Sequence, residues 1–162
     1  MEPQQHDASH ARVDDADDAA RVTAWESLIL AAHVLDAALE RQAQRDGGIS
    51  HGQFKILVLL AGTPRVTLGL KDVADILRYS LSRLSHALGT LERQGLVVRY
   101  PVVGGRRAQE ATLTPEGRKL VTKVLRSQRS ALRDPVLGSL SDEDVATLTR
   151  LSNHVIEHVD TD

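Results

Sequence analysis

Residues Leu70–Arg99, LKDVADILRYSLSRLSHALGTLERQGLVVR, contain two predicted helices separated by a very short turn. The first helix has an apolar stripe at the spacing i, i+3, i+4 and i+7, which marks one side of a helix. That stripe consists of Leu70, Val73, Ala74 and Leu77. Only Arg78 and Tyr79 separate it from Ser80, a favourable N-cap for the second helix. Two helices joined by so short a turn are typical of a helix-turn-helix.

The second helix is predicted to have an apolar inner side and an outer side of small or polar residues. At about 100° per residue, the inner side comprises Leu81, Leu84, Leu88 and Leu91. The outer side comprises Ser82, His86, Gly89 and Arg93, flanked by Arg83 and Thr90. Such residues allow a helix to enter a DNA major groove. An ordinary solvated surface is the alternative. Gly89 costs about 1 kcal/mol relative to Ala, and either close approach to DNA or a crowded packing contact would explain it.

A predicted hairpin follows, with strands LVVRYPVV and AQEATLT on either side of GGRR, Gly104–Arg107. Adjacent arginines at a tip repel each other unless an anion lies in front of them. We therefore expect Arg106 and Arg107 to meet DNA phosphates or the minor groove. A solvated hairpin is the alternative.

The flanking segments are predicted to be helical. The helix predicted to begin at Arg21 is apolar on more than one side. Ser50 and Gln53 form a candidate capping box for the helix that follows it. Thr114 and Pro115 should begin a helix that ends near Asp134, and Ser141 should begin the last. The predicted fold class is mostly α with a minor β component: a winged helix-turn-helix lobe and a flanking helical domain, with six helices and a wing sheet of two or three strands.

These patterns predict four regions. They are a disordered acidic tail (1–20), an N-terminal helix (21–46), a winged helix-turn-helix lobe (47–114, with the wing at about 97–114) and C-terminal helices (115–162).

Composition limits the possible functions. The chain has 162 residues, no Cys and four aromatic residues, which argues against thiol chemistry and against base-stacking modes of RNA binding. The net charge is −2, yet residues 65–126 carry twelve basic and five acidic side chains, as expected for a polyanion-binding face. The longest uninterrupted apolar run, Ile56–Ala61, is too short to span a bilayer, so we expect a cytoplasmic protein without a membrane partner.

Several of these segments resemble the MarR family of transcription regulators, named for multiple-antibiotic-resistance control. The family pattern LExxGLVxR matches LERQGLVVR (Leu91–Arg99), and LTxxG matches LTPEG (Leu113–Gly117). SHGQFKILVLL also fits, and the element order is similar over roughly residues 25–160. The family wing pattern D-x-R keeps its arginine as Arg107, but Gly105 stands in place of the aspartate.

The resemblance implies a homodimer whose helical dimerisation domain consists of the N-terminal helix (21–46) and the C-terminal helices (115–162). This dimer would place its recognition helices in successive major grooves of a pseudo-palindromic operator on double-stranded DNA. The implied contact residues in the helix and wing are Ser80, Ser82, Arg83, Ser85, His86 and Arg107; the outer-face Arg93 and the hairpin-tip Arg106 complete the predicted DNA-binding set. Many members are repressors released by small phenolic or other lipophilic ligands. Trp25, His33 and His51 are the candidate ligand contacts, with roles in the core or an interface as the alternative.

Two other functions fit parts of the sequence. HVIEH (His154–His158) fits a zinc-peptidase pattern, but only four residues follow it, so a third ligand has no place downstream. We therefore expect no catalysis, no metal and no cofactor. A helical protein–protein adaptor with a winged-helix lobe that does not bind DNA is the runner-up, because a fold does not guarantee a function.

Overall fold

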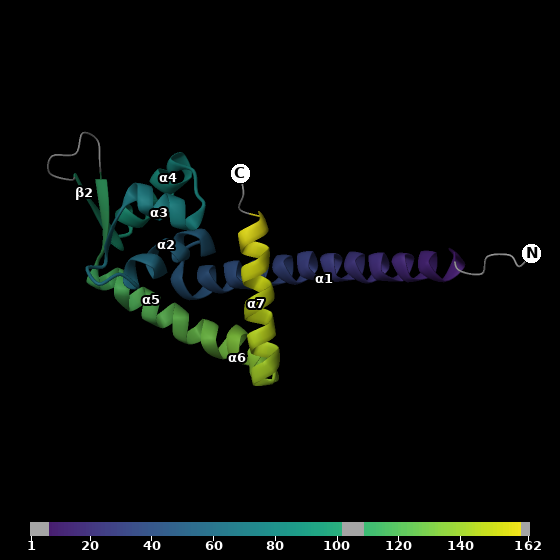
Figure 1. Cartoon of the computed structure of the whole chain (residues 1–162). Coiled ribbons are helices and arrows are strands. Elements are labelled where there is room, and N and C mark those ends of the chain that lie inside the picture. The colour runs from purple at the N-terminus through teal and green to yellow at the C-terminus, as the bar shows by residue number, and fades with distance from the viewer. Residues whose placement is uncertain (1–6, 102–108, 160–162) are drawn as a thin grey trace, which may run out of the picture. The chain divides into compact units, whose positions relative to one another are not determined.

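The computed structural model describes residues 7–101 and 109–159, which form two compact units. One unit extends to Leu39 and the other begins at Glu40. Figure 1 shows the helices and the small sheet, with the described segments coloured along the chain. The predicted mostly α fold with a small three-stranded sheet is confirmed.

Helix α1, Asp7–Gly47, begins earlier than the sequence predicts. Residues 7–20 are helical, so a disordered tail reaching residue 20 is wrong for this segment. Five of these fourteen residues are Ala, the strongest helix former, and acidic residues near a helix N-terminus favour its dipole. The predicted end is confirmed, because Gly48 adopts φ +65° directly after the helix.

The part of α1 before Leu39 has no buried side chain among residues 18–36. Trp25, Ile29 and Leu30 are 59%, 51% and 62% exposed. A window of 18 residues within 18–47 has a mean hydropathy of 1.4, so by length and composition alone this helix could cross a membrane. Glu26, His33 and Asp36 interrupt the apolar residues of this region, so it contains no long uninterrupted apolar run.

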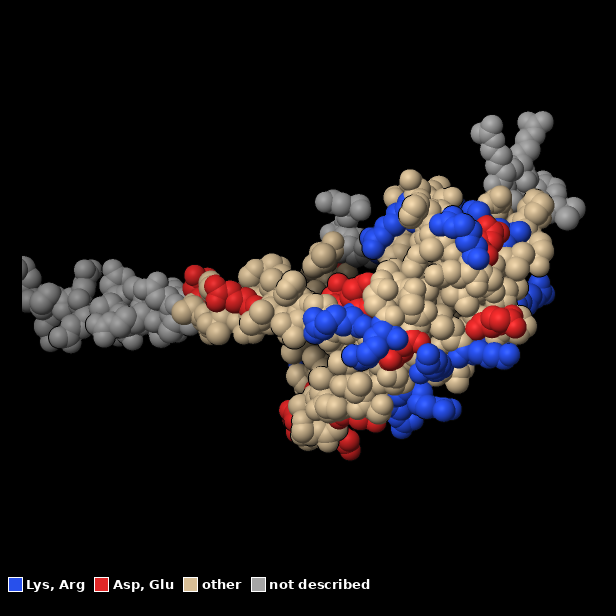
Figure 2. Space-filling view, turned by 180° about the vertical axis from the view of Figure 1, so that it is seen from behind, with Lys and Arg blue, Asp and Glu red and all other residues tan. Residues whose placement is uncertain are grey.

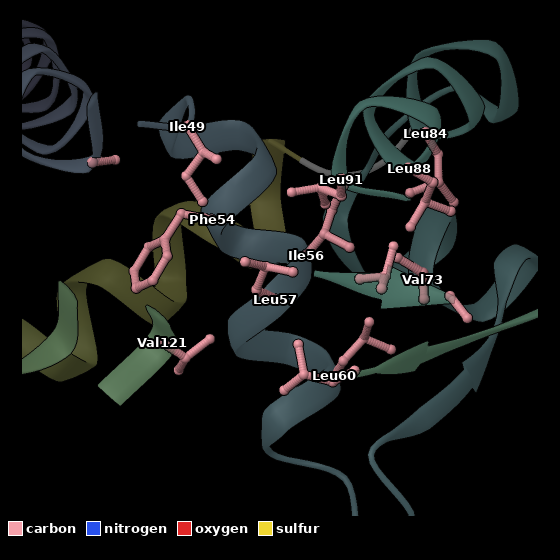
Figure 3. Packing of buried hydrophobic residues seen from close by; sticks show 14 of the residues in the cluster. Ile49, Phe54, Ile56, Leu57, Leu60, Val73, Leu84, Leu88, Leu91 and Val121 are labelled. Carbon is pink, nitrogen blue, oxygen red and sulfur yellow. The ribbon is translucent and has the colours of Figure 1, made fainter. Parts of the chain in front are cut away.

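The core of the second unit surrounds α2, His51–Ala61, whose capping box of Ser50 and Gln53 is present as predicted. Figure 3 shows Phe54 directed from α2 toward Val121 of α5, and Ile56 directed toward Leu91 of α4. Phe54, Ile56, Leu57 and Leu60 are all buried. A helix buried on several sides acts as the central packing element of this unit.

Two helices of the predicted helix-turn-helix follow: α3, Leu70–Leu77, and α4, Leu81–Arg93. Leu84, Leu88 and Leu91 are fully buried, as the periodicity predicts. The prediction that Leu81 also faces inward is wrong, since it is 62% exposed. It is the first residue of α4 and so lies beyond the end of the packed surface.

The sheet consists of β1 (Thr67–Gly69), β2 (Val97–Pro101) and β3 (Gln109–Leu113) in the order β1-β3-β2, all antiparallel. Pro101 ends an edge strand, where a missing N–H is tolerated. The hairpin tip, including Gly105, Arg106 and Arg107, lies outside the described residues.

Helix α5, Pro115–Gln128, begins at the N-cap Thr114 as predicted but does not end at Asp134. A π-helical turn, Arg129–Arg133, leads into a single further turn, α6, Asp134–Leu137. Proline is compatible with the first turn of a helix, so Pro135 does not stop the chain from continuing. The last helix, α7, covers Asp142–Val159.

The start of α5 depends on a glycine. A Cβ on Gly117 would lie 2.6 Å from Leu113 Cδ1 and closer still to the carbonyl oxygen of Leu96. That carbonyl already accepts hydrogen bonds from the backbone N–H and the hydroxyl of Thr114. Hence α5 can approach the end of the hairpin only because position 117 has no side chain.

We expect Gly117→Ala to lower the free energy of unfolding by about 3 kcal/mol, because overpacking here displaces backbone as well as side chains. Denaturant unfolding measures the loss. Gly89→Ala is the control, since only Arg93 Nη1, at 3.7 Å, lies near its added methyl group. It should stabilise α4 by up to about 1 kcal/mol. Equal stability of the two variants would contradict the prediction.

Candidate nucleic-acid interface

The exposed side of α4 is positioned by its buried side. Leu84, Leu88 and Leu91 fix the rotation of the helix about its axis, and this turns Ser82, Ser85 and His86 outward, where all three are exposed. The hydroxyl of Ser80 accepts a hydrogen bond from the Arg83 N–H at 3.2 Å and so caps the helix. The result is a capped helix that presents hydroxyl, imidazole and guanidinium groups to solvent.

The turn between α3 and α4 is very short. Arg78 adopts a left-handed conformation with φ 53°, and its N–H donates to Asp75. The N–H of Tyr79 donates to the carbonyl oxygen of Ala74 at 2.9 Å. These bonds close α3 and let Ser80 begin α4 directly, which is the geometry of a helix-turn-helix.

Gly89 lies on the outer side of α4. Among the described residues, and apart from the backbone of α4 itself, only the end of the flexible Arg93 side chain lies within 4 Å of a Cβ built there. A crowded packing contact therefore does not explain this glycine. Because Gly89 has no side chain, the exposed side of the helix is lower at this position than at His86 and Arg93.

The structure places all six described DNA-contact candidates on α4 or at its N-cap, and each is exposed. They are Ser80, Ser82, Arg83, Ser85, His86 and Arg93. Arg93 is tethered along the helix, since its guanidinium donates to Thr90 Oγ1 at 2.9 Å. The other two candidates, Arg106 and Arg107, fall outside the described residues.

Sequence reasoning missed an ion pair at the root of the wing. Arg99 on β2 donates to the Glu92 carboxylate of α4 through Nε at 3.0 Å and Nη2 at 2.6 Å, and its backbone N–H donates at 3.2 Å. These bonds hold the pKa of Glu92 below its ordinary value. Both residues belong to the LExxGLVxR pattern, which is the signal that could have revealed them.

On the face seen in Figure 2, Lys and Arg side chains form several separate groups, with acidic side chains between some of them. One group surrounds a groove of about 600 Å³ on α5: Arg118, Lys119, Lys123 and Arg126, together with Leu113, Pro115 and Thr122. The basic character predicted for residues 65–126 is thus divided between the α3–α4 region and α5.

The ligand candidates do not form one set. Trp25 and His33 line a groove of about 370 Å³ on α1. His51 lines a different groove of about 340 Å³ between α2 and α5, where Phe54 and Leu125 supply apolar walls and Lys55 and Gln128 supply polar groups. The structure therefore brings Trp25 and His33 together and leaves His51 in the other unit.

The HVIEH segment forms the exposed end of α7. Its two imidazole rings lie 4.0 Å apart, and His158 Nδ1 is 2.8 Å from the carbonyl oxygen of His154. Among the described residues, no three His, Cys, Asp or Glu side chains gather as metal ligands would. This segment does not have the arrangement of a catalytic zinc site.

The fold and the exposed α4 define a winged helix-turn-helix protein. No family model matches the chain. It is 35% identical to Sco3205, a MarR family transcriptional regulator from Streptomyces coelicolor whose structure was solved in complex with DNA; the TM-score is 0.80, and 84% of this chain and 86% of that chain are covered. This chain belongs to the MarR family of transcriptional regulators.

Two further relatives agree. AbsC, another MarR family regulator from Streptomyces coelicolor, is 27% identical with a TM-score of 0.79 and covers 86% of this chain and 94% of its own. The HTH-type transcriptional regulator PecS from Dickeya dadantii (strain 3937) is 29% identical over 128 residues, which are 78% of this chain and 75% of PecS.

The Glu92–Arg99 ion pair predicts a pH-dependent stability. Glu92→Gln should lower the free energy of unfolding by about 1 kcal/mol at neutral pH, because both partners are partly exposed. Folding lowers the pKa of Glu92, so the carboxylate stabilises fully above its unfolded-state pKa. This contribution is lost as the pH falls through the folded-state pKa.

Denaturant unfolding at a series of pH values checks this, and the difference between wild type and Glu92→Gln should shrink on acidification. Glu110→Gln, at an exposed position on β3, is the control and should change stability by less than about 0.5 kcal/mol. A Glu92→Gln effect independent of pH would count against the ion pair.

Proposed function

We propose that this chain is a sequence-specific regulator that binds double-stranded DNA as a homodimer and represses transcription from a pseudo-palindromic operator. In this proposal α4 enters the major groove, the wing contacts the adjacent backbone or minor groove, and a small lipophilic or phenolic ligand releases the DNA. The protein would act in the cytoplasm, where the DNA is.

The observation that carries the proposal is the exposed side of α4. Ser82, Ser85 and His86 can donate or accept hydrogen bonds at base edges, and Gly89 leaves room for close approach of the helix. No acidic residue lies at the centre of this side. The DNA complex of the 35% identical relative supports the same use of the fold.

The apolar surfaces of α1 and α7 support the homodimer. Leu28 and Leu35, seven residues apart on α1, are 41% and 47% exposed, and on α7 Leu148 and Leu151 are 46% and 49% exposed. Continuous apolar helix faces of this kind mark association surfaces. A second copy offers the same faces, so that a two-fold interface could cover both.

The groove between α2 and α5 supports a ligand. Its apolar walls suit the lipophilic part of a small ligand. The amide of Gln128 and the ammonium of Lys55 could bind a polar group of that ligand. His51 belongs to this site in our proposal. Trp25 and His33 are then assigned to the α1 face, where the second copy would cover them.

The DNA-binding proposal predicts a steep salt dependence. Affinity for a retained genomic fragment, measured by fluorescence anisotropy, should fall as salt rises, because bound protein releases counterions from the DNA.

Replacing Arg106 and Arg107 with Ala should weaken binding to all sequences alike. Ser82→Ala or His86→Ala should relax sequence preference by about 1–3 kcal/mol at one base pair.

Sequencing the fragments that the protein retains from a genomic library identifies the operator and its neighbouring genes. Failure to bind any fragment, or binding independent of salt, would contradict the proposal. It would favour the adaptor alternative.

The homodimer proposal predicts that a charge on α1 separates the copies. Leu28→Glu combined with Leu35→Glu should weaken dimerisation about thirtyfold or more, because two buried carboxylates would have no partner. Light scattering after size exclusion, over a range of concentrations, measures the mass. Gln109→Glu, at an exposed position on β3, is the control and should leave the dimer intact.

A wild-type protein that is monomeric at micromolar concentration would contradict the homodimer. If that monomer instead bound to lipid vesicles, the apolar face of α1 would be assigned to a membrane.

A further inference from the structure

Arg83, at the beginning of α4, lies over an aromatic ring. Its Cζ is 4.1 Å from the centroid of the Tyr79 ring, a cation–π distance. An arginine that stacks flat on a ring keeps the N–H groups at its edge available for hydrogen bonds. Arg83 remains exposed, so this edge is open to a ligand.

Tyr79 is itself held in place by neighbouring elements. Its hydroxyl donates to the carbonyl oxygen of Gly52, in the first turn of α2, at 3.3 Å. Its ring is half-buried against the hydrophobic core, and its N–H is bonded to Ala74. Tyr79 therefore links α2 and α3 to the first turn of α4.

Gly52 leaves the space that this arrangement needs. A Cβ at position 52 would lie 3.1 Å from the Tyr79 hydroxyl and 3.7 Å from Arg83 Nη2. The first contact is tighter than ordinary van der Waals packing, so a side chain there would move the tyrosine. Gly52, Tyr79 and Arg83 thus form one contact chain from α2 to the exposed end of α4.

We propose that Tyr79 is a positioning residue that holds the Arg83 guanidinium for contact with a DNA phosphate, and that Gly52 permits this position. The inference rests on the proposed DNA-binding function. A free arginine side chain loses rotamer entropy when it binds. Stacking on Tyr79 removes part of this freedom before DNA arrives, so the contact forms with a smaller loss.

The first experiment uses the protein without DNA. NMR relaxation of the Arg83 Nε–H group should show a restricted side chain in the wild type and in Tyr79→Phe, which retains the ring. The same group should be markedly more mobile in Tyr79→Leu. Equal mobility in wild type and Tyr79→Leu would overturn the proposal, whether or not the protein binds DNA.

The second experiment measures affinity for a pool of duplexes randomised in sequence, because a phosphate contact does not depend on the bases. Tyr79→Leu should lower the affinity about two- to tenfold while leaving the salt dependence unchanged, because the charge is still present. Arg83→Ala should also reduce the slope of log affinity against log salt by about 1. The double variant should bind as Arg83→Ala alone does.

If Tyr79 had a purely structural role, the fold-losses of affinity caused by Tyr79→Leu and by Arg83→Ala would multiply in the double variant. This outcome would overturn the proposal. Arg93→Ala is the matched control, and its effect should multiply with that of Tyr79→Leu. A wild-type protein that binds no duplex would refute the proposed function instead, and the NMR result would still decide the contact.

Gly52→Ala keeps the test decisive if Tyr79→Leu does not fold. Alanine favours a helix more than glycine does, and this gain offsets the cost of displacing Tyr79, so thermal unfolding should show little change in stability. The affinity should nevertheless fall about two- to tenfold in the wild-type background and stay unchanged in the Arg83→Ala background. A fall in both backgrounds would overturn the proposal.

Discussion

Three leucines on α4 are fully buried, and their burial sets the rotation of this helix about its own axis. Leu84, Leu88 and Leu91 enter the core that α2 organises, so a turn of the helix by one residue, about 100°, would expose them and bury polar groups without partners. The exposed side of α4 is therefore a consequence of the core. The packing of the leucines directs the hydroxyls of Ser82 and Ser85 and the imidazole of His86 outward, and no contact made by these polar side chains is required for it.

A second set of contacts joins α4 to the wing and to α5. Glu92 and Arg99 link the end of α4 to β2, while the Thr114 hydroxyl donates to the carbonyl oxygens of Gly95 and Leu96 and accepts from the Gly117 N–H. These residues belong to the two sequence patterns that identify the family. The patterns thus record the residues that hold the lobe together, and the groups proposed to touch DNA lie mostly outside them.

Local patterns in the sequence predicted the α2 capping box, the short α3–α4 turn and three of the four inward leucines. Leu81 was misplaced because periodicity does not show where a packed surface ends. The Glu92–Arg99 pair was missed because it joins a helix to a strand across a turn, a spacing that no helical rule covers. His51 was grouped with Trp25 and His33 because sequence order does not separate grooves on different elements.

The division of α4 into a buried and an exposed side also bears on how such a protein diversifies. Core leucines and surface residues alternate along one helix, and Ser82, Ser85 and His86 are exposed where Leu84 and Leu88 are buried. Under the proposed function, duplicated copies could therefore acquire new target sequences through a few surface exchanges without passing through an unstable intermediate. The residues that pack the core and the residues proposed for recognition are then different positions of the same helix of thirteen residues.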